Sequence, residues 1–215
     1  MSSSVQRKRI RKSPAARRAE IVAKAAEIAL SEGLECITLR RIGEELDVRP
    51  GLVSHYFPSA EDLVAEAFGS AATGELDALV PAEAPERTAT ERLADFFART
   101  SGPAWNDVSR LWINARHLTR YRPALRERVV HQESAWQGRL TGLIADGVAR
   151  GEFRTRDASV VAQQILVVLD GLGADAGADA HALPPAVARM ALDLAERELG
   201  LEHGVLGPAS GPADD

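Results

Sequence analysis

The sequence predicts an all-α protein, and three observations support that prediction. Alanine, leucine, arginine and glutamate dominate the composition, and their side chains lose little freedom in a helix. Aromatic residues make up only 5% of the 215 residues, whereas 45% are hydrophobic, enough to bury a core. Apolar residues recur at helical spacing along most of the chain, and capping residues precede several of these runs.

Three helices are expected near the N-terminus, the first long and the other two short. Ser13 followed by Pro14 is typical of a helix start, and Gly33 of a helix end. Thr38 can cap the second helix, and Pro50 is preset for the first turn of the third. The expected helices are residues 14–32, 38–46 and 50–57, with a three-residue turn between the last two.

Longer helices are expected in the rest of the chain. Ser59 to Asp62 has the spacing of a capping box, which places the start of a fourth helix there. Two prolines interrupt the helical pattern within residues 81–86, and Gly173 begins an expected loop that extends through residue 182. The expected helices are residues 59–79, 90–100, 104–120, 123–150, 157–174 and 185–199, about nine in total.

The composition changes along the chain and suggests four regions. A basic, disordered arm of residues 1–13 is expected to precede a small helical domain of residues 14–58. A larger helical domain should occupy residues 59–200. From residue 201 to 215 glycine, proline and acidic residues dominate, so this tail is expected to be disordered.

Residues 1–57 and residues 58–215 have net charges of opposite sign. Residues 1–57 contain eleven Lys and Arg against seven Asp and Glu, whereas residues 58–215 contain fifteen against twenty-four. A local basic patch attracts a polyanion even where the whole chain, with a net charge of −5, is acidic. The N-terminal part is therefore a candidate for contact with nucleic acid. Its first eighteen residues have no acid and seven cations: Arg7, Lys8, Arg9, Arg11, Lys12, Arg17 and Arg18.

The sequence gives no support for a secreted, membrane or metal-binding protein. Cys36 is the only cysteine, which excludes an internal disulfide and paired-cysteine metal sites. No apolar run approaches the length of a membrane span, and no apolar segment of a secretory signal follows the basic N-terminus. We therefore expect a cytoplasmic protein with no membrane partner.

An enzyme is one alternative class, and the motifs of catalysis are missing. The sequence contains no His-Glu-x-x-His, no Gly-x-Ser-x-Gly and no phosphate-binding glycine loop before a helix. The five histidines are scattered, and the glycines at 171 and 173 follow a helix instead of a strand. No catalytic residue, metal ligand or cofactor is expected.

Residues 38–57 have the layout of a helix-turn-helix. In this motif the first helix braces the second, whose exposed N-terminal residues enter the major groove of DNA. Gly51 and Ser54 are small and fall where the second helix would approach DNA closely, whereas Val53 and Phe57 can pack inward. The pattern favours a protein that binds double-stranded DNA.

The run TLRRIGEELDVRPGLVSHYFPSAEDLV resembles the N-terminal signature of the TetR family of transcriptional regulators. The segment PGLVSHYF is similar to the BetI-like branch of that family, and the match covers about residues 16–68. Further along, RPALRERV, a tryptophan, GEF and LDGL are similar to the C-terminal landmarks of BetI-like proteins. The resemblance implies a helix-turn-helix domain followed by a helical bundle that binds ligand and dimerises.

The resemblance also implies which residues contact DNA. Thr38 and Tyr56 fall at positions that bond phosphate oxygens, whereas Arg49 could address guanine or hold phosphate. One departure is Ala60, where the family commonly has a phosphate-binding lysine, and the basic arm is a candidate to compensate. The expected DNA-binding residues are Thr38, Arg40, Arg49, Pro50, Gly51, Ser54, His55 and Tyr56.

Polar residues beside apolar stripes mark a candidate ligand cavity in the larger domain. Such a cavity needs apolar walls with a few polar groups. Arg116 follows Trp112 by four residues, and Glu133 lies one turn before a second tryptophan. Arg116 and Glu133 either bind a ligand or pair with each other, since a buried charge is costly unless paired. The candidate ligand residues are Phe96, Trp112, Arg116, His117, Gln132, Glu133, Trp136 and Gln164.

The last two expected helices are unusually apolar. A helix that is apolar on all sides must be buried on all sides, and a two-fold interface of four helices achieves this. The family resemblance implies the same homodimer through these two helices. Dimerisation would place the recognition helices about one DNA turn apart, ~34–36 Å, and predicts a near-palindromic operator. The apolar residues of the first of these helices are Val160, Val161, Ile165, Leu166, Val168, Leu169 and Leu172.

Two functions are compatible with this arrangement. The first is a repressor, the family's usual mode, released from its operator when a small-molecule effector binds between the fourth and eighth helices and tilts the fourth. The alternative is an effector-independent DNA-binding protein whose C-terminal bundle serves only dimerisation. A cavity lined by Trp112 and Trp136 would argue against the alternative, and tight packing of these two residues on each other would support it.

Overall fold

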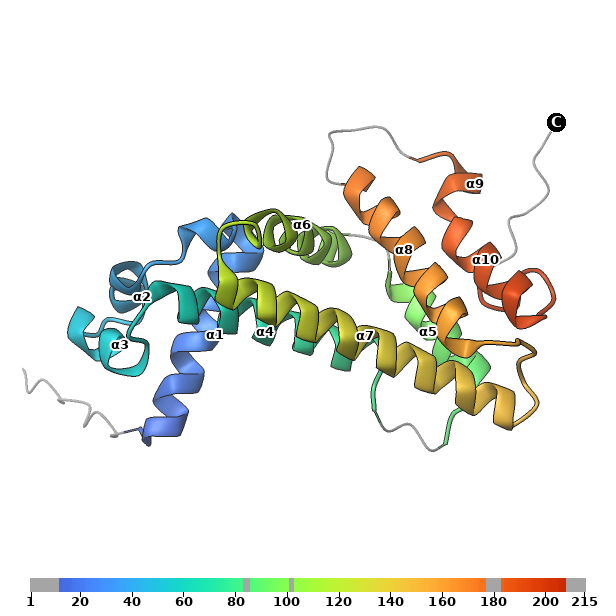
Figure 1. Ribbon diagram of the computed structural model, residues 1–215, viewed down its shortest axis with the longest axis horizontal. Coiled ribbons are helices and arrows are strands. Elements are labelled where there is room, and N and C mark those ends of the chain that lie inside the picture. The colour runs from blue at the N-terminus through green and yellow to red at the C-terminus, as the bar shows by residue number, and fades with distance from the viewer. Residues whose placement is uncertain (1–11, 83–85, 101–102, 177–182, 208–215) are drawn as a thin grey trace, which may run out of the picture.

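The structure, a computed structural model, describes residues 12–82, 86–100, 103–176 and 183–207. Within these ranges the chain forms ten α-helices and one short 3-10 helix, and no strand. The molecule is elongated: helices α2 (Leu39–Glu45) and α3 (Pro50–Tyr56) lie at one end and α10 (Met190–Leu199) at the other (Figure 1). The predicted all-α fold is confirmed.

The N-terminal helices begin and end at the residues that the sequence indicated. Helix α1 covers Pro14–Glu32, and its first turn is capped by Ser13, whose hydroxyl accepts a hydrogen bond from the Ala16 amide. Gly33 ends it with a φ of 101°, a conformation that a side chain would strain, and the 3-10 helix η1 (Leu34–Cys36) follows. The buried side chains of Ile21, Leu34, Ile42, Val53 and Phe57 form the core of this end.

Helices α4 (Ala60–Leu79) and α7 (Pro123–Ala149) run along the length of the molecule and pack against each other. Helix α4 also packs on α1, so it connects the helix-turn-helix end of the molecule with the larger helical domain. The buried amide of Gln132 on α7 donates hydrogen bonds to the Gly69 carbonyl and the Thr73 hydroxyl of α4. These bonds satisfy a polar group that burial would otherwise make costly.

Helices α5 (Ala89–Arg99), α6 (Pro103–Leu118) and α8 (Ala158–Ala176) complete the body of the larger domain. Helix α5 starts with a full capping box between Thr88 and Glu91. Helix α8 continues past Gly173, where the sequence had indicated a loop. A Cβ atom at Gly173 would lie 2.7 Å from the Ser109 hydroxyl, so the glycine permits close packing of α8 on α6.

The C-terminal region differs from the sequence expectation in two ways. The expected single helix of residues 185–199 is divided at Arg189 into α9 (Pro185–Ala188) and α10. The expectation that the tail is disordered from residue 201 is corrected for residues 201–207. The buried carboxylate of Glu196 accepts hydrogen bonds from the amides of Gly204 and Leu206, and Leu206 is 1% exposed. Residues 208–215 and 1–11 lie outside the described residues.

Candidate functional site

The pair α2 and α3 presents an exposed, polar face at one end of the molecule (Figure 1). Gly51, Ser54 and His55 are exposed, and their spacing places them on one face of α3. Arg49 is also exposed at the N-cap of this helix, while Val53 and Phe57 face the core. Pro50 occupies the first position of the helix. The predicted helix-turn-helix geometry is present, with its candidate base-reading residues accessible.

Other predicted DNA contacts flank this face. The Thr38 hydroxyl accepts a hydrogen bond of 3.1 Å from the Arg41 amide at the start of α2, which orients it there. The Arg40 side chain is 84% exposed and pairs with Glu44 on the next turn. The exposed ion pair of Arg40 with Glu44 is weak, so Arg40 is available to a phosphate. Tyr56 is half-buried, and its ring meets the ring of His55 edge-on at 5.3 Å.

The described cations among residues 1–18 have acidic partners. Lys12 and Arg17 both pair with Glu20 of α1, and Arg18 pairs with Glu66 of α4. Arg18 also lies 4.8 Å from the centre of the Phe57 ring, which tethers α1 to the end of α3. The other four cations of the arm lie outside the described residues.

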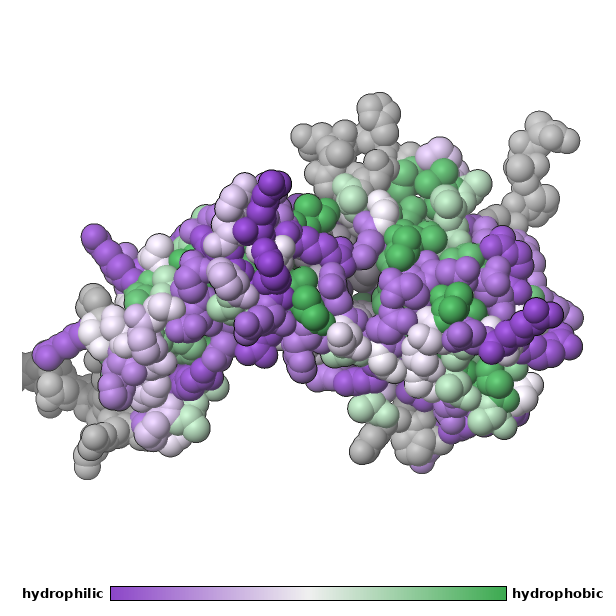
Figure 2. Space-filling view, viewed as in Figure 1, coloured by the Kyte–Doolittle hydropathy of each residue, from purple (hydrophilic) through white to green (hydrophobic). Residues whose placement is uncertain are grey.

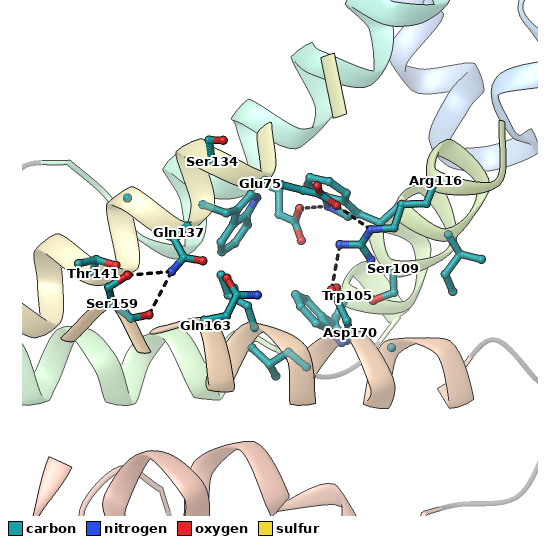
Figure 3. A pocket seen from close by; sticks show the side chains of 18 residues that line it. Glu75, Trp105, Ser109, Arg116, Ser134, Gln137, Thr141, Ser159, Gln163 and Asp170 are labelled. Atoms are coloured by element: carbon teal, nitrogen blue, oxygen red, sulfur yellow. Dashed lines mark hydrogen bonds and ion pairs between the residues drawn. The ribbon is translucent and has the colours of Figure 1, made fainter. Parts of the chain in front are cut away.

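A cavity of about 660 Å³ opens between α4, α6, α7 and α8 in the larger domain (Figure 3). The walls include Trp105, Trp112 and Trp136, which are all three tryptophans of the chain. Polar side chains enter it from each helix, notably Glu75 from α4 and Asp170 from α8. Its size and its mixture of aromatic walls with a few polar groups suit a small organic ligand. Further lining residues are Ser109, Ile113, Ser134, Gln137, Thr141, Ser159, Gln163, Leu166 and Leu169.

Arg116 forms the charged rim of this cavity. Its guanidinium pairs with Glu133 of α7 at 3.0 Å and with Asp170 of α8 at 2.9 Å, as Figure 3 shows. It also lies 5.2 Å from the centre of the Trp112 ring, within range of a cation–π contact. The ion pair that the sequence offered as an alternative for Arg116 and Glu133 therefore exists, and it lines the cavity.

Glu75 is the acid deeper in the cavity. Its Oε2 atom accepts a hydrogen bond of 2.9 Å from the indole Nε1 of Trp112. Burial raises the pKa of Glu75 to about 7, the hydrogen bond from Trp112 opposes this rise, and the charge of Asp170 adds to it. No cationic side chain pairs with Glu75 in the part of the chain that the structure describes. Near neutral pH this carboxyl group is therefore divided between its neutral and charged forms.

Four of the eight predicted ligand residues line the cavity: Trp112, Arg116, Glu133 and Trp136. Phe96 is instead buried behind the wall, with its ring 6.4 Å from that of Trp136. Gln132 faces α4 through its two hydrogen bonds, and His117 and Gln164 lie exposed on the surface. None of these last four residues lines the cavity.

Glu75 and Asp170 are the main cavity residues that the sequence analysis missed. Glu75 had a detectable signal, because it interrupts the apolar stripe that Phe68, Ala72 and Leu79 form on α4. Asp170 belongs to the face of α8 that also carries Gln163 and Leu166. Whether Glu75 and Asp170 come close to α6 depends on the angles at which the helices cross.

Two family models match the chain in its two parts. Residues 21–67 match the model for bacterial regulatory proteins of the tetR family. Residues 91–200, about half of the chain, match the C-terminal model of BetI-type transcriptional repressors. The chain belongs to the TetR family. It is a DNA-binding transcriptional regulator, and the helix-turn-helix of α2 and α3 is the family's DNA-binding motif.

Solved structures of other regulators have the same fold. A transcriptional regulator of Pseudomonas aeruginosa PAO1 is 22% identical, with a TM-score of 0.67 over 87% of this chain and 92% of that one. Salmonella enterica GusR is 18% identical, with a TM-score of 0.67 over 88% and 98%. A regulator of Saccharomonospora viridis, solved in complex with choline, is 22% identical, with a TM-score of 0.63 over 84% and 94%.

A comparison with curated proteins gave no match. Among the described helices, none combines the length and the hydropathy that a membrane span requires.

Proposed function

We propose that this TetR regulator is a repressor that binds a palindromic operator as a homodimer and releases it when a small organic cation enters the cavity. The observation that carries the proposal is the pairing of an exposed helix-turn-helix with a cavity in which Glu75 has no cationic partner among the described residues. The cavity also argues against an effector-independent protein, because Trp112 and Trp136 line an open space of about 660 Å³.

The DNA contacts are divided between bases and phosphates. Arg49 is long and exposed enough to reach guanine or a phosphate, whereas Ser54 and His55 share the outward face of α3. The hydroxyls of Thr38 and Tyr56 contact phosphate and fix the register of the helix on the duplex. Arg40, Pro50 and Gly51 complete the DNA-facing surface.

The homodimer forms through α8 and α10. Val160 and Val167, one heptad apart on α8, are 51% and 58% exposed, and Met190 at the start of α10 is 50% exposed. Hydrophobic residues gather on the face over α8 to α10 (Figure 2). Large exposed apolar residues that share a face mark an interaction surface, and a two-fold contact buries them on both copies at once.

An organic cation fits the charge and shape of the cavity. Arg116 carries one positive charge against the two carboxylates of Glu133 and Asp170, and Glu75 has no cationic partner among the described residues, so the cavity has a surplus of negative charge. A carboxylate removed from water is costly without a partner, and a ligand cation would offset that cost. The three tryptophan rings can face the apolar body of the ligand and its positive charge. The choline found in the Saccharomonospora viridis regulator is a cation of this class.

The DNA-binding half of the proposal is tested with a pool of random duplexes. The bound fraction is selected and sequenced at two salt concentrations. Enrichment of a near-palindromic site supports a sequence-specific dimer. Weak, steeply salt-dependent binding without enrichment contradicts it, because phosphate contacts alone produce that behaviour.

The effector half is tested with choline and its uncharged carbon analogue, 3,3-dimethylbutan-1-ol. Tryptophan fluorescence follows binding, because every tryptophan of the chain lines the cavity. Choline should bind and weaken the complex with the selected duplex, and the uncharged analogue should do neither. The variant Glu75→Gln keeps the shape of the site but removes its charge, so it should lose the preference for choline. Equal binding of the two compounds by the wild type contradicts a cationic effector.

A further inference from the structure

Helix α6 lines the cavity and also packs on α1 and η1 at the helix-turn-helix end. Trp105, Ser109, Trp112 and Arg116 of α6 line the cavity. Asn114 lies between Trp112 and Arg116 in the sequence, and its side chain contacts η1. Its Oδ1 atom accepts a hydrogen bond of 2.9 Å from the Leu34 amide.

The side-chain amide of Asn114 also binds a second residue of η1. The Nδ2 atom of Asn114 donates to both carboxylate oxygens of Glu35, at 2.9 Å and 2.8 Å. Asn114 thus uses its acceptor and its donor at once on two adjacent residues that are about eighty positions away in the sequence. Because both the oxygen and the nitrogen of the Asn114 amide are hydrogen-bonded, the orientation of the side chain relative to η1 is fixed as well as its distance from η1.

Segment η1 is well placed to pass on a displacement. Leu34 is fully buried in the core formed with α1, α2 and α3, so movement of its backbone would displace that core. Gly33, just before it, has a φ of 101°, and a Cβ atom there would lie 3.2 Å from Glu35 Oε2 and 3.7 Å from Asn114 Oδ1. The backbone turn that presents η1 to Asn114 therefore depends on this glycine, because any side chain would be strained at its φ.

We propose that Asn114 is the coupling residue that carries a change of α6 at the cavity to the DNA-binding end. Its hydrogen bonds to Leu34 and Glu35 bind η1 to α6. A ligand that moves Trp112 or Arg116 then moves η1 and the helix-turn-helix with it. This inference rests on the proposed regulatory function, because it states how the two sites of that function communicate. It adds α6 to α4 as a second connection between them.

Coupling between two sites is reciprocal, so DNA bound at α3 must also change the cavity. This reciprocity gives a test without any effector. All three tryptophans line the cavity, so quenching of their fluorescence by acrylamide reports on the cavity alone. Quenching is measured with and without the duplex selected from the random pool, for the wild type and for Asn114→Ala.

The duplex should change the quenching of the wild type, and this change should be at least about halved in Asn114→Ala, which keeps only the connection through α4. Both proteins should bind the duplex with affinities within about twofold of each other. Glu35→Ala should behave like Asn114→Ala. Glu35→Gln retains an acceptor for the Asn114 amide and should behave like the wild type. Asn106→Ala, which removes the same type of side chain eight residues earlier on α6, is the matched control.

A second measurement uses choline at saturation. It should weaken duplex binding by about fivefold or more in the wild type and by less than about twofold in Asn114→Ala, with unchanged choline affinity. If choline does not bind the wild type, the cationic effector is wrong, and the quenching experiment still tests the coupling. The proposal is overturned if Asn114→Ala shows the wild-type change in quenching, or if the duplex binds the wild type without changing its quenching.

Discussion

The indole of Trp112 donates a hydrogen bond of 2.9 Å to the carboxylate of Glu75 and so joins α6 to α4 inside the cavity. The other side of the same indole meets the Phe68 ring edge-on at 5.0 Å, deeper in the core of α4. A ligand that contacts Trp112 or Glu75 therefore acts on both helices that lead toward the DNA-binding end.

The first prediction concerns the protonation of Glu75. Its pKa in the folded protein is about 7, above its ordinary value of 4.5, so the folded state binds the proton more tightly than the unfolded state. This contribution to stability is fully present below about pH 4.5 and is lost as the pH rises through 7. Between pH 5 and 8 the free energy of unfolding of the wild type should therefore fall relative to Glu75→Gln, by on the order of 2 kcal/mol.

Urea unfolding of both proteins at pH 5, 6, 7 and 8 provides the measurement. The difference in stability should grow with pH and be largest at pH 8, where the wild type carries an unpaired charge in the cavity. Parallel pH profiles would show that Glu75 ionises in the folded protein as easily as in the unfolded chain. Choline should reduce the difference at pH 8 if it supplies the missing positive charge.

The second prediction concerns DNA contact by α3 and its flanks. Arg49→Ala should weaken binding of the selected duplex by about 1–3 kcal/mol, and Tyr56→Phe should weaken it less, because only a hydroxyl is lost. Arg156→Ala is the control, because this arginine is exposed close to α8, which lies near the opposite end of the molecule. Fluorescence anisotropy gives the affinities, and light scattering gives the oligomeric state. Loss of the dimer in Arg49→Ala would refute its assignment as a DNA contact.

The helices could be predicted from the sequence because their signals are local. Ser13, Thr38 and Ser59 each cap the helix that follows, and the structure shows their hydroxyls accepting from the amide three residues on. Gly173 was misread because a glycine within a helix and a glycine after it look alike in a sequence. Only the position of Ser109 on α6, 2.7 Å from where a Cβ would be, explains why glycine is needed there.

The cavity could be predicted only in part. Trp112, Arg116, Glu133 and Trp136 were found because each lies on or beside an apolar stripe of its own helix. Whether a polar residue beside such a stripe enters a cavity depends on how the helices cross. Gln132 therefore faces α4, although it is next to Glu133 in the sequence.

The third prediction concerns the homodimer. Val167→Asp places a charge in the proposed interface on α8, where burial in a dimer would leave it without a partner. The protein should become a monomer at micromolar concentration and lose most of its affinity for a palindromic duplex. Val148→Asp changes an exposed valine of α7, and it should leave the dimer intact. A dimeric Val167→Asp protein would place the interface elsewhere.

The last prediction concerns residues 201–207, which the sequence had suggested to be disordered. Glu196 is 2% exposed, and its carboxylate accepts amide hydrogen bonds from Gly204 at 3.0 Å and from Leu206 at 2.8 Å. A chain that ends at Gly200 loses these donors and the buried Leu206 side chain, so its free energy of unfolding should fall by about 3 kcal/mol or more. A chain that ends at Gly207 keeps both and should differ from the full chain by less than about 0.5 kcal/mol. Equal stability of the two truncated chains in urea would mean that the contact between Glu196 and residues 201–207 contributes nothing to the fold.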